Sequence, residues 1–542
     1  MTHELLGPGT TRPRAALSSL SALASTGIVR PYGPRTLVRL GAALTRWGTG
    51  PAGGFASLAA RMPRAAAVED EAGSLTFAQL HEQANALARV LAREGVGEGD
   101  GVALLARNHR WFVLSTIAVS RLGGRILYLN TAFSGPQTVE LLEREQPVVV
   151  LHDQEFSPVV EDVPAHLPRL LTWREDDAEP SAARYVGDLV EGVATGDLEP
   201  PTQEGRSVIL TSGTTGTPKG ANRASGSLSA AGALVSRIPL RHQSRMLVAA
   251  PMFHTWGWAH LNLAMLLGST LVLRRRFDPE DFLAAVERER CEVAVVIPVM
   301  LSRVLELPAD VRERYDTSSL KVVTASGSAL PGDLATRWMD AFGDNLYNTY
   351  GSTECAWATI AQPGEMRARP GTAGRPPIGT VVALYDDDGE PVPYGGTGRI
   401  FVSNGAQFEG YTNGDTKPVI DGRMATGDLG RFDDGLLFVE GRDDEMIVSG
   451  GENVYPQEIE DCIARHPAVA ECAVVAVDDD EWGQRLAAYV VLEAGQDADE
   501  DAIKAHVKTH LARYKVPRDV RFIDGLPRNE TGKVLKRELS KD

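Results

Sequence analysis

The residues with the most distinctive chemistry lie in a loop rich in glycine, serine and threonine. An apolar run, Ser207–Leu210, indicates a buried strand, and it leads into Thr211-Ser-Gly-Thr-Thr-Gly-Thr-Pro-Lys219-Gly220. Glycines let backbone N–H groups approach an anion, the hydroxyls donate further hydrogen bonds, and Lys219 adds positive charge. The segment therefore predicts a phosphate-binding loop rather than an ordinary surface loop. It differs from the P-loop pattern, Gly-x4-Gly-Lys followed by Ser or Thr, because Lys219 precedes Gly220.

A pair of histidines has the spacing of metal ligands. His506 and His510 are four residues apart in a segment with helical periodicity, so both rings would lie on one face of a helix. No third ligand is near them in the sequence, and the sequence alone therefore does not predict a metal site at this pair.

Composition limits the kinds of protein that the chain can be. Its 542 residues are 43% hydrophobic and 23% charged, with a net charge of −17. This composition disfavours disorder and fibrous structure, and the acidity argues against nucleic-acid binding. We find no apolar run long enough to span a membrane. The four cysteines form no Cys-x2-Cys pair, so no disulfide or zinc framework is expected. A reducing, cytoplasmic location is therefore the expected one.

Residues 1–48 differ from the rest because they carry six arginines and a single acidic residue. Leu37, Leu40, Leu44 and Trp47 recur at helical spacing, which predicts an amphipathic helix. Such a basic segment could contact an anionic membrane surface as a peripheral attachment. It could also be an extension that packs on its own domain or part of a targeting peptide. The sequence leaves these alternatives open.

The elements that must position the phosphate-binding loop follow an alternating pattern. From about residue 60 to about residue 370, apolar strands alternate with amphipathic helices, which indicates an α/β fold with mostly parallel sheets. Helices are expected over 76–95, capped by Thr76, and over 257–267. The expected strands are Val102–Ala106, Val148–Leu151, Ser207–Leu210, Met246–Ala249, Thr270–Leu273, Ala294–Ile297 and Lys321–Ala325.

The pattern changes beyond about residue 370. Short strands separated by turns rich in Asp, Gly and Asn predict a small β-rich subdomain. Charged, turn-forming residues at Gly441–Asp444 indicate a boundary, after which a compact unit of strands and helices closes the chain. The expected organisation is a basic extension (1–48), a large N-terminal domain (49–443) and a smaller α+β C-terminal domain (444–542).

Five further motifs, taken with the loop, resemble those of the adenylate-forming enzymes, which include acyl-CoA synthetases and adenylation domains. They occur in the family's order and are Tyr350-Gly-Ser-Thr-Glu354, Thr426-Gly-Asp428, Gly441-Arg442-Asp-Asp444, Ser449-Gly-Gly-Glu-Asn453 and Asn529-Glu-Thr-Gly-Lys533. The resemblance covers roughly residues 50–540 and is greatest to bacterial long-chain fatty-acyl-CoA synthetases. One departure is Arg423-Met424, which stands where the family usually has an aromatic residue.

The resemblance implies a two-step ligase that uses ATP, Mg²⁺ and coenzyme A. A carboxylic acid, expected to be a medium- or long-chain fatty acid, would react with ATP to give acyl-AMP and diphosphate, and coenzyme A would then displace AMP. Within the family, the alternatives are an acyl-AMP ligase that loads a carrier protein and a ligase for aryl or other acids. Outside it, a nucleotide-binding module would be expected to lack Lys533 or Glu354, and the position of Lys219 disfavours a P-loop NTPase.

The resemblance also assigns roles to individual residues. Lys533, Thr211, Glu354 and His254 would be catalytic, and Glu354 would also hold Mg²⁺. ATP and AMP would be bound by Thr211, Ser212, Gly213, Thr214, Thr215, Gly216, Lys219, Gly327, Ser328, Ala329, Tyr350, Gly351, Ser352, Thr353, Asp428, Arg442 and Lys533. Coenzyme A would be bound by Ser449, Gly450 and Gly451, the hinge would be Asp444, and the acyl pocket would contain His254, Trp256, Gly257, Trp258 and Gly327.

The implied roles have structural alternatives. Tyr350, like the tryptophans, could belong to the core, Glu354 could cap a helix, and Lys533 could be an exposed lysine. His254 stands where amino-acid-activating relatives usually have an aspartate, which disfavours an amino-acid substrate. This histidine could gate the pocket, orient the carboxylate or simply be packed.

Overall fold

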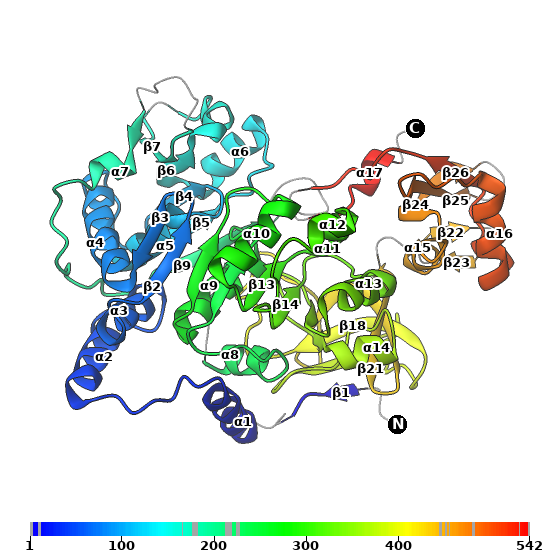
Figure 1. Ribbon diagram of the computed structural model, residues 1–542, viewed down its shortest axis with the longest axis horizontal. Helices are drawn as coiled ribbons and strands as arrows, with labels where there is room; N and C mark the ends of the chain where they lie inside the picture. Colours follow the sequence, from blue (N-terminus) through cyan, green and yellow to red (C-terminus); the bar gives the residue numbers. More distant parts are fainter. Residues whose placement is uncertain are drawn as a thin grey trace.

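The computed structural model describes residues 4–8, 12–164, 166–175, 183–211, 219–223, 228–412, 414–443, 447–449, 452–454, 456–479, 483–529 and 532–539. A large body is followed along the chain by a smaller one that lies beside it (Figure 1). The expected α/β class, with parallel sheets and a separate, smaller C-terminal domain, is confirmed. The exact boundary stays a prediction, because Asp444 lies outside the described residues.

An eight-stranded sheet forms the centre of the large body. Its order is β16-β15-β14-β13-β11-β12-β2-β3, parallel from β15 to β2 and antiparallel at both edges. Strands β13 (Val293–Val296) and β14 (Val322–Ala325) are buried throughout, as expected for parallel strands covered on both faces. The other strands are β2 (Ala66–Asp70), β3 (Gly73–Thr76), β11 (Arg245–Val248), β12 (Thr270–Leu273), β15 (Leu346–Tyr350) and β16 (Thr359–Ala361).

A seven-stranded sheet of order β10-β9-β5-β4-β6-β7-β8 shares a hydrophobic core with the first sheet. Helix α4 (Phe77–Arg93) begins with a capping box between Thr76 and Gln79, which confirms the expected N-cap. The strands are β4 (Gly101–Leu105), β5 (Arg125–Tyr128), β6 (Pro147–Asp153), β7 (Arg169–Trp173), β8 (Arg184–Tyr185), β9 (Arg206–Thr211) and β10 (Lys219–Arg223). The helices of the two layers are α5 (Arg110–Arg121), α6 (Gly135–Glu145), α7 (Val186–Leu189), α8 (Leu228–Val235), α9 (Thr255–Leu267), α10 (Pro279–Glu289), α11 (Pro298–Glu306), α12 (Ala309–Arg312), α13 (Gly332–Phe342) and α14 (Pro363–Ala368).

An antiparallel sheet forms the β-rich subdomain that the turn pattern predicts. It contains β17 (Val381–Tyr385), β18 (Thr397–Ser403), β19 (Val419–Ile420), β20 (Arg423–Asp433) and β21 (Leu436–Arg442). A strand from the start of the chain, β1 (Glu4–Leu6), pairs with the edge of β17 and was not predicted. Arg423 makes an ion pair with Glu4 and donates to the Tyr385 hydroxyl at 2.7 Å, so the residue that departs from the family pattern holds β1.

The C-terminal domain has its own sheet and its own core. Its strands are β22 (Ile447–Ser449), β23 (Glu452–Val454), β24 (Val469–Asp479), β25 (Gly483–Leu492) and β26 (Asp519–Phe522), in the order β23-β22-β25-β24 with β26 beside β25. Helices α15 (Pro456–Ile463) and α16 (Glu500–His510) contribute Ile459 and Ile503 to this core, and α17 (Lys536–Leu539) lies near the end of the chain.

Three helices connect the first strand to the sheets. Helix α1 (Arg12–Ser25) packs closely on α8, with Ser19 against Gly232. Helix α2 (Pro34–Trp47) has one buried residue, Trp47, which contacts α3 (Pro51–Arg61). The predicted helix is therefore present, but Leu37 and Leu44 of its apolar stripe are exposed. Among the described residues, no helix has both the length and the apolar character needed to cross a bilayer.

A buried, hydrogen-bonded histidine–aspartate pair lies at the end of β6. His109 and Asp153 are both inaccessible to solvent; the histidine Nε2–H donates to the carboxylate at 2.8 Å, while its Nδ1 accepts the Trp111 N–H and so caps α5. Thr172 and the Arg107 N–H also donate to Asp153. Burial alone would raise the pKa of Asp153, but His109 and the other donors hold it below its ordinary value.

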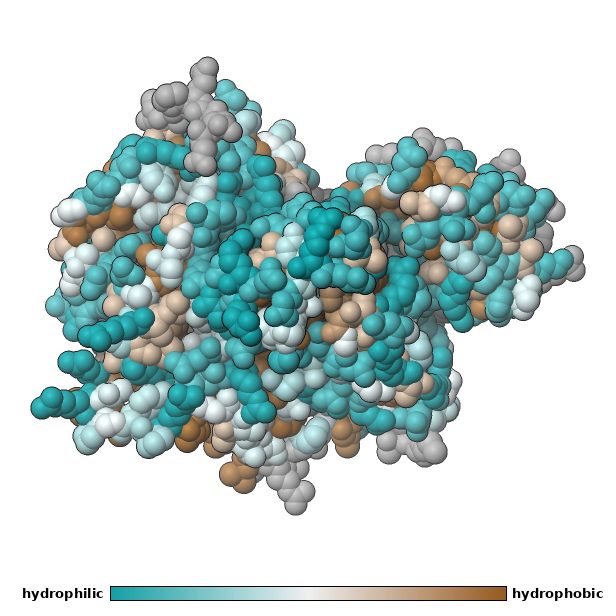
Figure 2. All heavy atoms as spheres, in the orientation of Figure 1, coloured by the Kyte–Doolittle hydropathy of each residue, from teal (hydrophilic) through white to brown (hydrophobic). Residues whose placement is uncertain are grey.

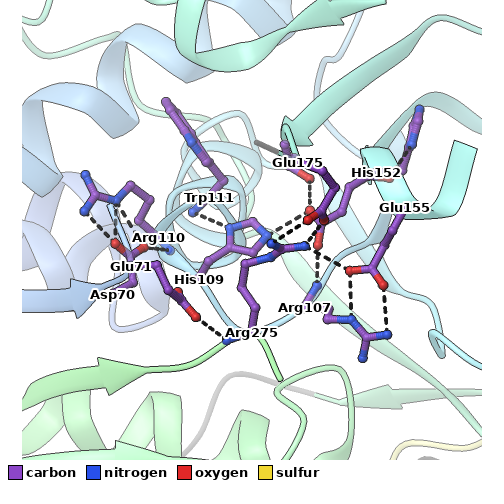
Figure 3. A network of polar contacts seen from close by, with 12 residues as sticks. Asp70, Glu71, Arg107, His109, Arg110, Trp111, His152, Glu155, Glu175 and Arg275 are labelled. Atoms are coloured by element: carbon purple, nitrogen blue, oxygen red, sulfur yellow. Dashed lines mark hydrogen bonds and ion pairs between the residues drawn. The ribbon is translucent and has the colours of Figure 1, made fainter. Parts of the chain in front are cut away.

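Arginines extend this network from the seven-stranded sheet to the eight-stranded one (Figure 3). Arg110, at the start of α5, pairs with the buried Asp70 of β2 at 2.6 Å. Arg275, just after β12, pairs with Glu155 at 3.0 Å and with Glu175. The two sheets are therefore joined by charge pairs as well as by their common core.

Replacing Asp153 with alanine should destabilise the protein, because three buried donors lose their acceptor. We expect Asp153→Ala to lower the free energy of unfolding by about 3 to 5 kcal/mol, measured by urea denaturation at neutral pH. The matched control is Asp188→Ala, which removes an exposed partner of Arg174 and should cost about 1 kcal/mol or less. Equal effects of the two substitutions would contradict a structural role for the buried pair.

Candidate active site

Four chain segments meet at one edge of the eight-stranded sheet. Strands β11, β13, β14 and β15 are parallel neighbours and are followed by Pro251–His254, Ile297, Ser326–Ala329 and Gly351–Glu354. The carboxyl ends of adjacent parallel strands lie at the same edge, so these loops converge where open α/β sheets bind ligands. The structure thus brings together, at the ends of β14 and β15, seven of the residues assigned to nucleotide binding, whose role stays a prediction: Gly327, Ser328, Ala329, Tyr350, Gly351, Ser352 and Thr353.

Gly327 shapes the loop after β14. Its φ of +101° is unfavourable for other residues, and an added Cβ would lie 3.3 Å from Ile297 Cγ2. The loop therefore passes close to the end of β13, where a side chain would restrict the space between the two strand ends.

Tyr350 ends β15, and its side chain reaches the β-rich subdomain. The hydroxyl donates to Asp428 Oδ2 at 2.6 Å. Asp428 lies opposite Arg442 in the register of β20 and β21, with Arg442 Nη1 at 3.4 Å from Oδ1. Burial raises the pKa of Asp428, although Tyr350, Arg442 and the positive charge of Lys533 oppose this. Burial and the nearby carboxylate raise the pKa of Tyr350 well above its ordinary value, so its hydroxyl stays a donor.

Glu354 is a largely buried carboxylate four residues further on. Its Oε1 accepts a hydrogen bond from the Tyr411 hydroxyl, and its N–H donates to Ser352 Oγ at 3.2 Å. Burial acts to raise the pKa of Glu354, but the hydroxyls of Tyr411 and Ser352 and the charge of Lys417 lower it below its ordinary value. An ionised carboxylate at this position fits Mg²⁺, which uses one or two carboxylates together with phosphate oxygens and water.

The glycine- and hydroxyl-rich loop connects two antiparallel strands. Thr211 ends β9 and pairs in register with Lys219, which begins β10. The carbonyl of Gly220 accepts the N–H of Thr412 at 2.8 Å, and Thr412 follows the tyrosine that binds Glu354. The base of the loop therefore lies next to that carboxylate. The loop itself, with the predicted residues Ser212, Gly213, Thr214, Thr215 and Gly216, lies outside the described residues.

Lys533 stands on a tight turn of the C-terminal domain. The Asn529 N–H donates to the Lys533 carbonyl at 3.0 Å, and Asn529 Oδ1 accepts the Lys533 N–H at 2.9 Å. Between them Gly532 has a φ of +75°, which favours glycine. Lys533 closes the turn with Asn529, and its side chain is exposed.

This turn packs against the strand ends of the large body. A Cβ on Gly532 would lie 2.6 Å from Val299 Cγ1 and 3.2 Å from Ile297 Cδ1, so the backbone passes directly over the end of β13. An ion pair between Arg337 of α13 and Glu493, at 3.1 Å, also joins the two domains. The turn therefore brings Lys533 of the C-terminal domain close to the strand ends. Its positive charge is near enough to lower the pKa of Asp428.

His254 and two tryptophans lie at the start of α9. His254 occupies the N-cap position, burial lowers its pKa to about 3, and its buried Nε2 has no hydrogen-bond partner among the described residues. Trp256 Nε1 donates to the Val296 carbonyl at 3.1 Å, which fixes the indole beside the end of β13. Trp258 is buried. Close packing explains why position 257 is a glycine, since a Cβ there would lie 2.4 Å from the carbonyl oxygen of Pro251.

The remaining predicted residues belong to the segment that joins the two domains. Ser449 lies in β22, in register with Glu452 of β23. Gly450, Gly451 and the predicted hinge Asp444 lie outside the described residues. The assignments to coenzyme A binding and to the hinge therefore stay predictions.

Sequence reasoning missed three polar residues that support the site. Tyr411 binds Glu354, and Asn404 donates to the carbonyls of Cys355 and Trp357, both at 2.7 Å. Asn108, at the end of β4, donates to the Val248 and Ala250 carbonyls beyond β11. All three lie in irregular segments without a periodic pattern, so no local signal identifies them.

Comparison with known families agrees with this arrangement. The family described as AMP-binding enzyme matches residues 55–412, and the AMP-binding enzyme C-terminal domain matches residues 458–533. A feruloyl-CoA synthase of Amycolatopsis sp. is 35% identical over 490 residues, covering 89% of this chain and 96% of its own. A long-chain-fatty-acid–CoA ligase of Mycobacterium tuberculosis is 31% identical, covering 86% and 92% respectively.

Solved structures give the same result. An anthranilate CoA ligase in complex with anthranoyl-AMP superposes with a TM-score of 0.81 at 26% identity, covering 90% of this chain and 96% of its own. With matched models for both domains and relatives aligned over most of their length, the chain belongs to the AMP-binding enzyme family and is an ATP-dependent acid–CoA ligase.

Proposed function

We propose that the enzyme activates an aromatic carboxylic acid as its acyl-adenylate and transfers the acyl group to coenzyme A. The site assignment is supported by the convergence of Tyr350, Asp428, Glu354 and the Lys533 turn at one edge of the parallel sheet. Tyr350 and Asp428 would bind the nucleoside, with the carboxylate accepting hydrogen bonds from the ribose hydroxyls. Glu354 would hold Mg²⁺, which when bound would neutralise phosphate charge.

In the first step, a carboxylate oxygen of the acid attacks the α-phosphorus of ATP. An O–P bond forms, the bond to the β-phosphate oxygen breaks, and diphosphate leaves. Negative charge accumulates on the α-phosphate, and the Lys533 ammonium would stabilise it from the turn packed over the strand ends. Burial keeps His254 neutral, so it can orient the substrate carboxylate without adding charge.

In the second step, the coenzyme A thiolate attacks the acyl carbonyl, the C–O bond to AMP breaks and the thioester forms. Lys533 is no longer needed, and we propose that the C-terminal domain turns at Asp444 to present Ser449, Gly450 and Gly451 to the pantetheine arm. Such a rotation would break the Arg337–Glu493 pair, which is exposed and therefore weak. A single mobile domain would thus serve both half-reactions.

The choice of an aromatic acid rests on the relatives and on one residue. Feruloyl-CoA synthases and an indoleacetate–CoA ligase of Aromatoleum aromaticum, 34% identical, are among the curated relatives, and the anthranilate ligase is among the structural ones. The indole of Trp256 donates to the Val296 carbonyl and packs edge-on against His260, with 4.3 Å between the ring centroids. It would give an aromatic acid a rigid surface on which to pack. The fatty acid expected from the sequence remains the second candidate, favoured by the Mycobacterium tuberculosis relative.

Removing the Lys533 charge should affect the two half-reactions differently. We expect Lys533→Ala to lower the rate of acyl-AMP formation about a hundredfold or more, while transfer to coenzyme A from supplied acyl-AMP keeps its rate. The control is Lys508→Ala, an exposed lysine of the same domain, which should change neither rate. Equal loss of both half-reactions in Lys533→Ala would contradict the assignment.

A panel of acids tests the substrate class. With ATP, Mg²⁺ and coenzyme A, we expect the highest kcat/KM among benzoates, cinnamates and indole-3-acetate, and low values from acetate to oleate. Trp256→Leu should lower kcat/KM for the best aromatic acid about threefold to tenfold, the worth of one aromatic contact, and leave the value for acetate unchanged. A maximum among fatty acids would favour the second candidate, and adenylate without thioester would indicate a carrier-protein acceptor.

We also propose that the N-terminal extension contacts anionic lipid. Among the residues that the structure describes, most of the exposed large apolar ones belong to this extension, and we call six of them the N-terminal apolar surface: Leu17, Leu20, Val29, Leu37, Val38 and Leu44. Apolar side chains reach the lower edge of the molecule where α1 lies (Figure 2). Helix α2 carries Arg35, Arg39 and Arg46 and no acidic residue, which complements a negative surface.

Polar substitutions on this surface should weaken lipid binding without affecting catalysis. We expect the triple variant Leu37→Ser, Val38→Ser, Leu44→Ser to lower co-sedimentation with phosphatidylserine vesicles several-fold, while activity on soluble acids is retained. Val419→Ser, at an exposed apolar residue of the β-rich subdomain, is the matched control. Unchanged sedimentation of the triple variant would show that the extension only packs on its own domain.

A further inference from the structure

The C-terminal domain contains a cluster of metal-ligand side chains away from the candidate active site. Cys462 near the end of α15 meets His506 and His510 of α16, and one ligand atom from each of the three lies within 4.8 Å of the others. The ring of His466, just beyond α15, packs edge-on against His506 at 5.2 Å between centroids. The sequence shows the histidine pair but not its third member, which is 44 residues away and is supplied by the packing of two helices.

Hydrogen bonds to carbonyls fix which nitrogen of each ring is free. His506 Nε2 lies 3.0 Å from the Cys462 carbonyl, and because a carbonyl only accepts, this nitrogen carries the proton and Nδ1 has the lone pair. His510 Nδ1 likewise donates to the His506 carbonyl at 2.8 Å, which leaves Nε2 free. Carbonyl partners of this kind orient the histidines of metal sites.

The donor set selects the class of metal. One thiolate and two imidazoles suit Zn²⁺ and similar divalent ions, whereas Mg²⁺ and Ca²⁺ prefer oxygen ligands. Metal–ligand bonds of about 2.0 to 2.3 Å would put the three atoms roughly 3.4 Å apart, so the atoms, now within 4.8 Å, must approach by up to about 1.4 Å. The exposure of His510 gives an ion access from solvent. Cys462 is buried behind it.

We propose that Cys462, His506 and His510 bind one divalent transition-metal ion of the Zn²⁺ class, with water in the fourth position, and that the ion fastens the last turn of α16 to α15. Ile503 and Val507 already anchor the first part of α16 in the domain core, while His510, at its end, is exposed. His466 is excluded from the ligand set because its Nδ1 accepts the Ala468 N–H at 3.3 Å.

Cobalt binding to the full-length protein, without a histidine tag and after treatment with chelator, tests the proposal. We expect one equivalent of Co²⁺ to give thiolate-to-cobalt charge-transfer absorption, which one equivalent of Zn²⁺ removes. Cys462→Ser should abolish this absorption, and Cys472→Ser, the other cysteine of the same domain, should keep it. Absence of the absorption in the wild type, or its persistence in Cys462→Ser, would overturn the proposal.

Affinity and stability measurements identify the ligands. We expect His506→Ala and His510→Ala to weaken Zn²⁺ binding at least about tenfold by calorimetry, and Zn²⁺ to raise the Tm of the wild type but not of Cys462→Ser. All variants should keep the adenylation rate measured with Mg²⁺ alone, which shows that they fold. His466→Gln should bind Zn²⁺ like the wild type, and a loss as large as that of His510→Ala would overturn the three-ligand assignment.

Discussion

The hydrogen bond from the Tyr350 hydroxyl to Asp428 connects parts of the protein that must keep a fixed relation. Tyr350 ends a strand of the parallel sheet, Asp428 lies in the antiparallel sheet, and its partner in register, Arg442, is close to the start of the C-terminal domain. Because the contact is buried, leaving either group without its partner would cost roughly 1 to 3 kcal/mol, or more for the charged one.

Elements with a strong local pattern could be predicted from the sequence. The mostly apolar runs Val293–Val296 and Val322–Ala325 form strands that differ from the expected ones by a single residue at their ends, and Thr76 caps α4 as expected. Strand β1 could not be predicted, because Glu4–Leu6 is too short for a pattern and its partner strand, Val381–Tyr385, is far away in the sequence. Pairing between such distant segments depends on the whole fold rather than on local preference.

The candidate site shows the same division. Residues within recognisable motifs, such as Tyr350 and Glu354, were assigned from the sequence, and the structure places them at one edge. Tyr411 and Asn404 were missed, because the loops in which they lie approach Glu354 and Cys355 only in the folded chain. The sequence also did not establish the substrate class, because the way in which side chains such as Trp256 are held against neighbouring strands is visible only in the folded chain.

Strand β1 completes the edge of the antiparallel sheet, and this has a consequence for biosynthesis. Residues 4–6 leave the ribosome long before β17, which follows them by about 375 residues. At 5 to 20 residues per second, the first strand would wait roughly 20 to 75 s for its partner. During that interval an unpaired strand and the apolar helix behind it are open to other chains.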